Sequence, residues 1–420
     1  MLKAGSLLYA IFIALLITSV ATTFVLFAYY SRLHNQQYEA KTRALLRLNA
    51  ALNYLKVETK EEAWKASKIL FEEEPASQVQ LQSEPWGVFR LIAAKTGFKQ
   101  DTFKKAAIVG YAPQKEEPVA LYLADKNQPL SLAGDARIRG NAYLSERGIK
   151  RAYIEGRSYS GKTTLEGIKK LSKSQLPAVN PMLESAIEMQ LQKGIPLAMD
   201  TVYLYDEEST EGYLSIERSA HQERLGVYSA ENIHLQAGKL IGPIIIKSEK
   251  EIALGADLKA EHLLLLAPKI VIASGFRGSV QAMASDSILI GSEVDLLYPS
   301  ALVVKSEQKA AYIEVGEKSI VRGEVALLGD PNKVQSALIK INKEAVVEGN
   351  VYSAKAIALQ GRIHGMATME KFYLKTKSSV YENHLLDGVI DRNQLPEAYI
   401  GAAVLTEWSL TTKEIMAWLK

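Results

Sequence analysis

The chain has 420 residues, of which 48% are apolar, so it is long enough for two or three domains with a large core. Its net charge is +3 and no basic tract stands out, so composition gives no reason to expect nucleic acid as a partner. Cysteine is absent, which excludes disulfides, thiolate metal sites and cysteine nucleophiles, and the six histidines lack metal-ligand spacing. We therefore expect no metal site and no cofactor.

The first element in the chain is an apolar segment without a charged residue between Ala4 and Ser31. An α-helix needs about 20 apolar residues to cross the hydrocarbon core of a membrane. The run is longer than the apolar core of a cleaved signal peptide, and no small-residue cleavage motif ends it. We predict a membrane anchor over residues 1–31, with Tyr29 and Tyr30 at the lipid interface.

Small residues recur at every fourth position of this segment: Ser6, Ala10, Ala14, Thr18 and Thr22. In lipid, such a stripe allows two helix backbones to approach closely. We predict that it is a packing face for another membrane helix. The alternative is that the stripe only reflects the composition of apolar segments.

The flanking charges give a mixed signal for orientation. Only Lys3 precedes the apolar run, whereas Arg32, Lys41 and Arg43 follow it, so a literal positive-inside count places the body in the cytoplasm. A very short N-terminal tail is, however, easily held on the inner side. We expect a single-pass protein of the bacterial inner membrane with a periplasmic body.

Residues 32–75 are predicted to form an amphipathic helical stalk. Four leucines recur at intervals of three, four and three residues: Leu45, Leu48, Leu52 and Leu55. A capping-box pattern at Thr59 and Glu62 predicts a second short helix that ends near Phe71. Residues 76–200 are predicted to be a mixed α/β connecting region, with a helix between about Leu165 and Lys193.

A weak repeat runs through the β-rich part of the chain, in which an apolar residue precedes a glycine by two positions and Val or Ala follows it by two. Its glycines are Gly140, Gly278, Gly323, Gly349 and Gly365. The flanking apolar residues point to one face of a strand, and glycine permits a close backbone approach at a corner.

Four isoleucines that open apolar strands recur 18 or 19 residues apart: Ile233, Ile252, Ile270 and Ile288. A period near 20 residues is typical of solenoids, whose turns stack to form a continuous core. We predict a mainly β protein with an N-terminal α-helix and a parallel β-helix over residues 201–390, in which residues 295–300 form a bulge. The alternative is a β-sandwich with glycine-rich turns.

The tail, residues 391–420, is predicted to be a capping segment. Trp408 and Trp418 would cover the last turn of the solenoid, because an open end invites edge pairing. A short amphipathic helix is expected from about Thr412 to Leu419.

Some β-helices act on polysaccharides, so the carboxylates of this chain are candidate catalytic groups. Glycoside chemistry requires two convergent carboxylates, whereas the candidates are scattered: Asp286, Asp295, Glu314, Glu324 and Glu348. Glu324 and Glu348 each adjoin a repeat glycine and could face the same side, but solvated exterior residues are the simpler interpretation. No nucleophile elbow, zinc-protease motif or phosphate loop is present, so we predict no catalytic residue.

Two segments resemble known families. Residues Lys3–Ala10 and Asn49–Leu55, with the helix between them, look like minor pilins and pseudopilins, although a leader cut after Gly5 places Ala10 where most such proteins carry Glu. The glycine-spaced strands resemble bactofilin-like β-helices. The whole chain is also similar to uncharacterised single-pass envelope proteins of Bacteroidetes-type bacteria, notably around Ala120–Asp125 and Tyr153–Ser158.

These observations favour a non-enzymatic structural or assembly protein of the bacterial cell envelope, and the resemblance to minor pseudopilins implies a component of a pilus or secretion assembly. Its expected partners are the lipid bilayer and proteins that contact the membrane helix or the β-helix, with no nucleic acid. Two alternatives remain, a membrane-tethered carbohydrate-active enzyme and a bactofilin-like filament former.

Overall fold

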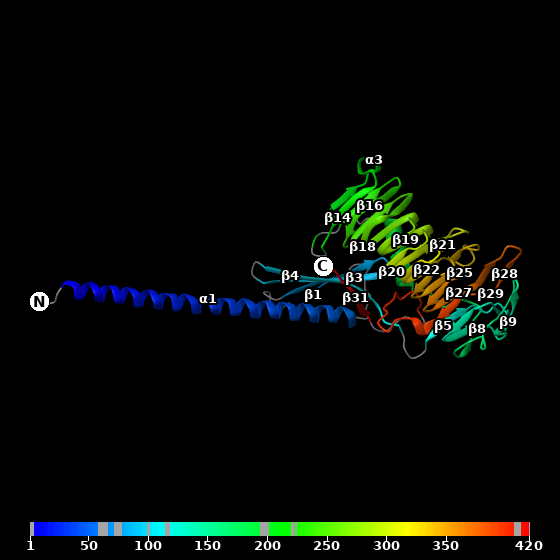
Figure 1. Ribbon diagram of the computed structural model, residues 1–420, viewed down its shortest axis with the longest axis horizontal. Coiled ribbons are helices and arrows are strands. Elements are labelled where there is room, and N and C mark those ends of the chain that lie inside the picture. The colour runs from blue at the N-terminus through cyan, green and yellow to red at the C-terminus, as the bar shows by residue number, and fades with distance from the viewer. Residues whose placement is uncertain are drawn as a thin grey trace. The chain divides into compact units, whose positions relative to one another are not determined.

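The computed structural model describes residues 4–57, 66–70, 78–98, 101–113, 118–193, 201–219, 222, 225–406 and 413–419. The protein is mainly β, with one long N-terminal helix (Figure 1). It divides into two compact units. One contains Met1–Leu55, Ser67–Gln82 and Ala93–Lys104, and the other contains Lys56–Ala66, Ser83–Ile92 and Lys105–Lys420.

Helix α1 runs without interruption from Ala4 to Val57. Gly5–Tyr54 is long and apolar enough to cross a membrane, and its most apolar stretch is not buried. The side chains of residues 5–32 are all exposed, whereas Ala44, Leu48, Ala51 and Leu52 are buried. The helix therefore has an exposed apolar first part and an amphipathic second part, as the leucine spacing predicts.

A five-stranded sheet has the order β1-β2-β3-β4-β31. Its strands are β1 (Ala66–Leu70), β2 (Val79–Trp86), β3 (Phe89–Phe98), β4 (Asp101–Tyr111) and β31 (Lys413–Leu419). Only Gly87 and Val88 separate β2 from β3, so these two strands form an antiparallel hairpin. Strand β31 is also antiparallel to its neighbour β4.

Two predicted helices are corrected by this sheet. The helix expected from Thr59 to Phe71 is replaced in its described part by β1, and residues 58–65 and 71–77 lie outside the described residues. The helix expected over Thr412–Leu419 is strand β31, in which Leu419 pairs with Ala106. In both places the local helical pattern is overridden by strand pairing, which for β1 is with the next strand β2 and for β31 is with β4, about 300 residues earlier.

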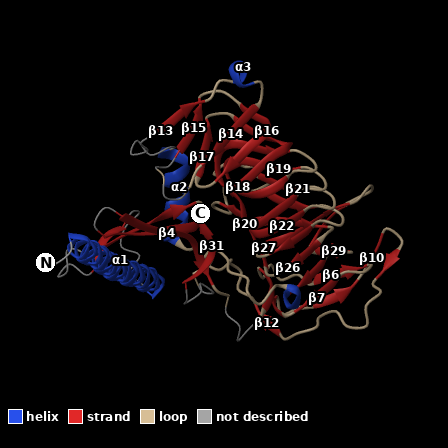
Figure 2. Cartoon of the chain, turned by 60° about the vertical axis from the view of Figure 1, so that its left-hand side comes forward, coloured by secondary structure: helices blue, strands red, loops and turns tan. Residues whose placement is uncertain are grey.

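The remaining strands include a parallel sheet (Figure 2). The strands that precede helix α2 are β5 (Val119–Leu123), β6 (Leu130–Ala133), β7 (Arg137–Arg139), β8 (Asn141–Leu144), β9 (Ile149–Arg151), β10 (Tyr153–Ile154), β11 (Arg157–Ser158) and β12 (Lys169–Leu171). Helix α2 follows as Pro181–Lys193, within the range predicted for a helix.

The chain then continues through β13 (Thr201–Leu204), helix α3 (Glu207–Thr210), β14 (Tyr213–Glu217), β15 (Leu225–Ser229), β16 (Ile233–Ile241), β17 (Ile244–Ser248), β18 (Glu251–Ile272), β19 (Arg277–Ile290), β20 (Asp295–Lys305), β21 (Tyr312–Val315) and β22 (Ile320–Leu328). The last elements before β31 are β23 (Leu338–Ile341), β24 (Val346–Glu348), β25 (Val351–Leu359), β26 (Arg362–His364), β27 (Ala367–Lys375), β28 (Val380–Glu382), β29 (His384–Leu386), β30 (Val389–Asp391) and the 3-10 turn η2 (Arg392–Gln394).

Parallel pairing joins residues that are about one sequence repeat apart. Ile233 pairs with Ile252, and Ile270 pairs with Ile288, as the isoleucine repeat predicts. The second pair continues through Ile313, Ile339 and Ile357, and all these side chains are fully buried. The repeated residues therefore form one internal column of the core.

One column of parallel strands can be followed from end to end of this sheet. In spatial order its members are β13, β15, β17, β18, β19, β20, β22, β25, β27, β5, β8 and β12. Strands β5, β8 and β12, which lie in the predicted connecting region, continue the column beyond β27. We call this column the strand ladder.

The predicted bulge at residues 295–300 is an interruption of pairing within strand β20. Leu296 pairs with Val321 and Ser300 with Gly323, so Leu297, Tyr298 and Pro299 lie opposite a single residue of β22. The Tyr298 hydroxyl donates a hydrogen bond to the Ile400 carbonyl oxygen at 3.0 Å. The bulge thus contacts the segment that leads to the C-terminal strand.

Candidate functional site

The predicted membrane stripe lies on the exposed first part of α1. Its threonine hydroxyls bond within the helix, because Thr18 Oγ1 donates to the Ala14 carbonyl at 2.7 Å and Thr22 Oγ1 donates to the Thr18 carbonyl at 2.8 Å. These threonine hydroxyls are therefore already used as donors within α1. What the stripe provides for a neighbouring helix is small side chains that permit close backbone approach. Contact with a partner helix stays a prediction.

Three of the five repeat glycines stack directly on one another. A Cβ added to Gly365 would lie 1.8 Å from the Gly349 carbonyl oxygen, and one added to Gly349 would lie 1.7 Å from that of Gly323. Gly323 has φ +146°, and its Cβ would lie 1.8 Å from the Ser300 carbonyl oxygen. No side chain fits between backbones this close, so the column requires glycine.

The other two repeat glycines are placed differently. Gly140, with φ +117°, continues the same line beyond Arg392, because an added Cβ would lie 3.0 Å from the Arg392 Cβ. Gly278 pairs with Leu296, which pairs with Val321, so the bulge in β20 displaces it from the column. An added Cβ there would still lie 2.5 Å from the Ala260 carbonyl oxygen.

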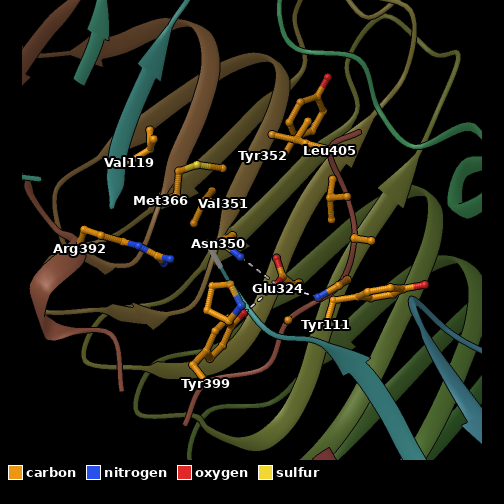
Figure 3. A pocket seen from close by; sticks show the side chains of 15 residues that line it. Tyr111, Val119, Glu324, Asn350, Val351, Tyr352, Met366, Arg392, Tyr399 and Leu405 are labelled. Atoms are coloured by element: carbon orange, nitrogen blue, oxygen red, sulfur yellow. Dashed lines mark hydrogen bonds between the residues drawn. The ribbon is translucent and has the colours of Figure 1, made fainter. Parts of the chain in front are cut away.

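The residue after Gly323 is a buried carboxylate that the sequence interpretation placed on the exterior. Glu324 is 1% exposed. Its Oε1 accepts hydrogen bonds from the Tyr399 hydroxyl at 2.7 Å, the Ala402 backbone N–H at 3.0 Å and Asn350 Nδ2 at 3.1 Å (Figure 3). Two of these donors belong to the segment that leads from η2 toward β31. Glu324 therefore holds this segment on the strand ladder.

The segment is fixed by further contacts on both sides of Glu324. Gly401 exchanges two backbone hydrogen bonds with Tyr111, at 2.8 and 2.9 Å. An added Cβ at Gly401 would lie 2.3 Å from Glu324 Oε1, so only glycine allows the backbone to approach the carboxylate. We call Glu324, Asn350, Tyr399 and residues 401–402 the carboxylate clasp.

A cavity of about 70 Å³ adjoins the carboxylate clasp. Its wall is mostly apolar, including Val119, Val351 and Leu405, and Arg392 also lines it (Figure 3). Arg392 Nη1 is buried and has no hydrogen-bond partner among the described residues. The cavity is large enough for several water molecules, which can satisfy this donor.

Burial raises the pKa of Glu324 to about 7, against the opposing effects of its hydrogen bonds and the charge of Arg392. Burial also raises the pKa of Tyr399 well above its ordinary value. A carboxyl group with a pKa near 7 has the proton affinity of a general acid. Glu324 is, however, covered by its own hydrogen-bond donors, and it is the sole acidic residue among the described residues that line the cavity. We interpret it as a structural group.

The other carboxylates considered from the sequence do not join Glu324. Glu348 and Asp295 both form ion pairs with Arg322, and all three side chains are about 30% exposed. Glu314 bonds to Lys340 and Asn342 on the neighbouring turn. Glu324 and Glu348 therefore have different partners, and their carboxylates do not converge on one groove.

No cluster of His, Asp or Glu in the described part of the chain is arranged to hold a metal ion. The end cap predicted from Trp408 and Trp418 can be compared with the structure only at Trp418. Trp418 is 52% exposed on β31, where Lys105 lies over its ring, and Trp408 lies outside the described residues.

The clasp could not be found from the sequence because its parts are distant along the chain. Glu324 follows a repeat glycine, but its burial depends on Tyr399 and Ala402, which contact it across more than 70 residues. The one local signal is the pair of polar residues that follow Gly323 and Gly349, which are Glu324 and Asn350. These positions stack on successive turns, so the two side chains meet.

No family model matches the sequence, and no curated protein matches it. Among solved structures, the chain is similar to the competence-associated pilin ComZ from Thermus thermophilus. The identity is 11%, and the alignment covers 91% of this chain and 97% of that one with a TM-score of 0.27. A similarity of this size does not establish a shared fold.

Proposed function

We propose that this chain is a membrane-anchored, pilin-like structural subunit of a bacterial envelope assembly. The observation that carries the proposal is the division of α1. The side chains of residues 5–32 are exposed and mostly apolar, whereas Leu48 and Leu52, later on the same helix, are buried within a compact unit that also contains strand residues. One helix thus joins a membrane segment to a folded unit, which is what a polymer built on membrane helices requires.

The sheet supports this reading. Strands β2 and β3 form an antiparallel hairpin, and β31 returns from the C-terminus to pair with β4. Residues 112–412 are therefore inserted between two neighbouring strands. We propose that the pilin-like part comprises α1 and this sheet, and that the inserted part is a separate module carried by it.

We infer that the inserted module is a parallel β-helix. The parallel pairing of successive turns, the buried isoleucine column and the stacked glycines Gly323, Gly349 and Gly365 support this inference. The glycines are its corners. In this view the β-helix includes residues 119–171 as well as residues 201–390, and it serves as a rigid scaffold or tip module.

The proposal places the anchor at residues 1–31 in the bacterial inner membrane, with the body in the periplasm and other anchors as the partners of α1. Leucine at Ala10 and Ala14 should reduce contact between anchors, because leucine separates helix backbones. Leucine at Ser19 and Thr23 is the matched control, since these positions lie about 100° around the helix from the stripe.

The test is site-specific photo-cross-linking of the membrane segment in cells. A several-fold loss for the Ala10→Leu/Ala14→Leu chain, with no loss for the Ser19→Leu/Thr23→Leu chain, is the expected result. Equal cross-linking in both chains would mean that the stripe only reflects the composition of an apolar segment. A reporter fused at Lys420 that is active only in the cytoplasm, or release of the full-length chain by carbonate, would refute the anchored periplasmic subunit.

A further inference from the structure

The two ends of the strand ladder carry opposite charge. At one end, residues 201–217 contain five acidic residues and no Lys or Arg. At the other, residues 137–173 contain ten Lys or Arg and three Asp or Glu, so this segment alone is more positive than the whole chain at +3. Figure 2 shows β13 and β12, which belong to these segments, at opposite ends of the parallel sheet.

Both ends are open edges. Strand β13 pairs with β15 on one side, and β12 pairs with β8 on one side. Within the described residues neither strand has a partner on its other side. Each therefore presents a row of backbone donors and acceptors that another strand can use.

Exposed apolar side chains accompany both edges. Leu204 is 73% exposed at the acidic end, and Tyr213 is 60% exposed beside it on β14. At the basic end, Ile168 and Leu171 are each 64% exposed. An isolated solenoid covers such residues with a terminal cap, whereas a stacked one covers them with the next turn.

We propose that a second copy of this chain stacks on the ladder head to tail, with its acidic end on the basic end of the first. This inference goes beyond the proposed membrane-anchored subunit and does not depend on it. Charges at sheet edges commonly prevent self-association, and here they oppose the contact of two like ends. They attract unlike ends, so the pattern selects one direction of stacking.

The register within the ladder specifies the contact. The residue column that begins at Leu204 passes through Tyr228, Lys247, Leu266, Met283, Val303, Ala326, Tyr352, Thr368, Tyr122 and Tyr143 and ends at Lys170. Continuing the same parallel pairing into a second copy places its Leu204 next to Lys170. Neighbouring strands lie about 4.8 Å apart, a separation that a disulfide can bridge.

The absence of cysteine from the chain makes a direct test possible. Leu204→Cys and Lys170→Cys are introduced into separate full-length chains of different tag size, purified in detergent micelles, mixed and oxidised. The expected product is the mixed 204–170 disulfide, at least several-fold above either homodimer. It should fall several-fold at 1 M salt, where the Debye length is about 3 Å.

The matched control mixes Leu204→Cys with Lys259→Cys, because Lys259 is an exposed residue within the ladder. A yield of the 204–170 disulfide no greater than that of the 204–259 disulfide would overturn the proposal. The charges at the two ends would then be interpreted as protection against association. A dominant 204–204 disulfide would overturn it in favour of head-to-head contact. Circular dichroism of each single variant establishes that the chains are folded. Contact between anchors alone would not favour the 204–170 pair over the control, so failure of the anchor proposal remains distinguishable.

Discussion

The carboxylate clasp should make the protein less stable as the pH rises toward neutrality. Glu324 has a pKa raised from 4.5 to about 7 by burial, so the folded protein binds this proton more tightly than the unfolded chain does. Its contribution to stability is therefore complete below about pH 4.5 and is lost as the pH rises through about 7. At about 1.4 kcal/mol for each tenfold change in proton affinity, the loss is about 3 kcal/mol.

Glu324→Gln removes the titration and keeps an oxygen that can accept from Tyr399 and Ala402. We expect the free energy of unfolding of the variant and the wild type to differ little at pH 5. At pH 8 the variant should be more stable by up to about 3 kcal/mol, which corresponds to several degrees in Tm. The measurement is thermal unfolding of the full-length chain in detergent micelles across this pH range. Exchange of the Ala402 amide hydrogen reports the same opening locally.

Other buried groups change the stability in the opposite direction as the pH rises, so the test is the difference in stability between the wild type and Glu324→Gln. Burial lowers the pKa of His262 and of His364, and their effect is to reduce stability as the pH falls. Glu314→Gln is the matched control. Burial alone would raise the pKa of Glu314, but hydrogen bonds from Lys340, Asn342 and Tyr312 lower it. If the difference between wild type and Glu324→Gln is the same at pH 5 and pH 8, the clasp does not titrate as described.

Three further substitutions test the backbone contacts by thermal melts of the same full-length protein. Gly323→Val should lower the free energy of unfolding by at least about 1–3 kcal/mol, because Gly323 has φ +146° and adjoins a carbonyl oxygen. The control Arg322→Ala should lower it by under about 1 kcal/mol. Equal losses in the two variants would contradict the stacked column. Gly401→Ala should displace the segment from Glu324 and remove most of the pH dependence, and an unchanged pH profile would count against the clasp. Gln281→Leu should cost about 1–3 kcal/mol for each of the two backbone groups that it leaves unpaired, the Trp86 carbonyl at the end of β2 and the Val88 N–H in the turn that follows. A neutral result would contradict this hydrogen bonding.

The sequence predicts those parts of the fold in which each turn pairs with the next. Ile233 and Ile252 recur at the spacing with which their strands pair, and Gly323 and Gly349 recur at the spacing with which their backbones touch. The apolar run at the start of α1 is equally local. For the two repeats, the number of residues between successive copies equals the number of residues in one turn, so periodicity in the sequence is sufficient to predict which residues become neighbours.

The features that the sequence did not predict depend on contacts between distant segments. Strand β31 has a local pattern that suits a helix, and its partner β4 lies about 300 residues earlier. Strand β5 continues the ladder beyond β27, although it precedes the rest of that ladder in sequence. Glu324 looks like an exterior residue until Tyr399 covers it. None of these pairings leaves a periodic trace.

The return of β31 to β4 has a consequence for synthesis of the protein. A ribosome makes the chain from its N-terminus at about 5–20 residues per second, so β4 emerges well before the residues that pair with it. Strand β5 likewise waits for β27. During that interval the edge of β4 is open to other chains, until Lys413–Leu419 has been made and closes it. A nascent chain stopped before Lys413 would therefore keep an unprotected strand edge however well its ladder had folded.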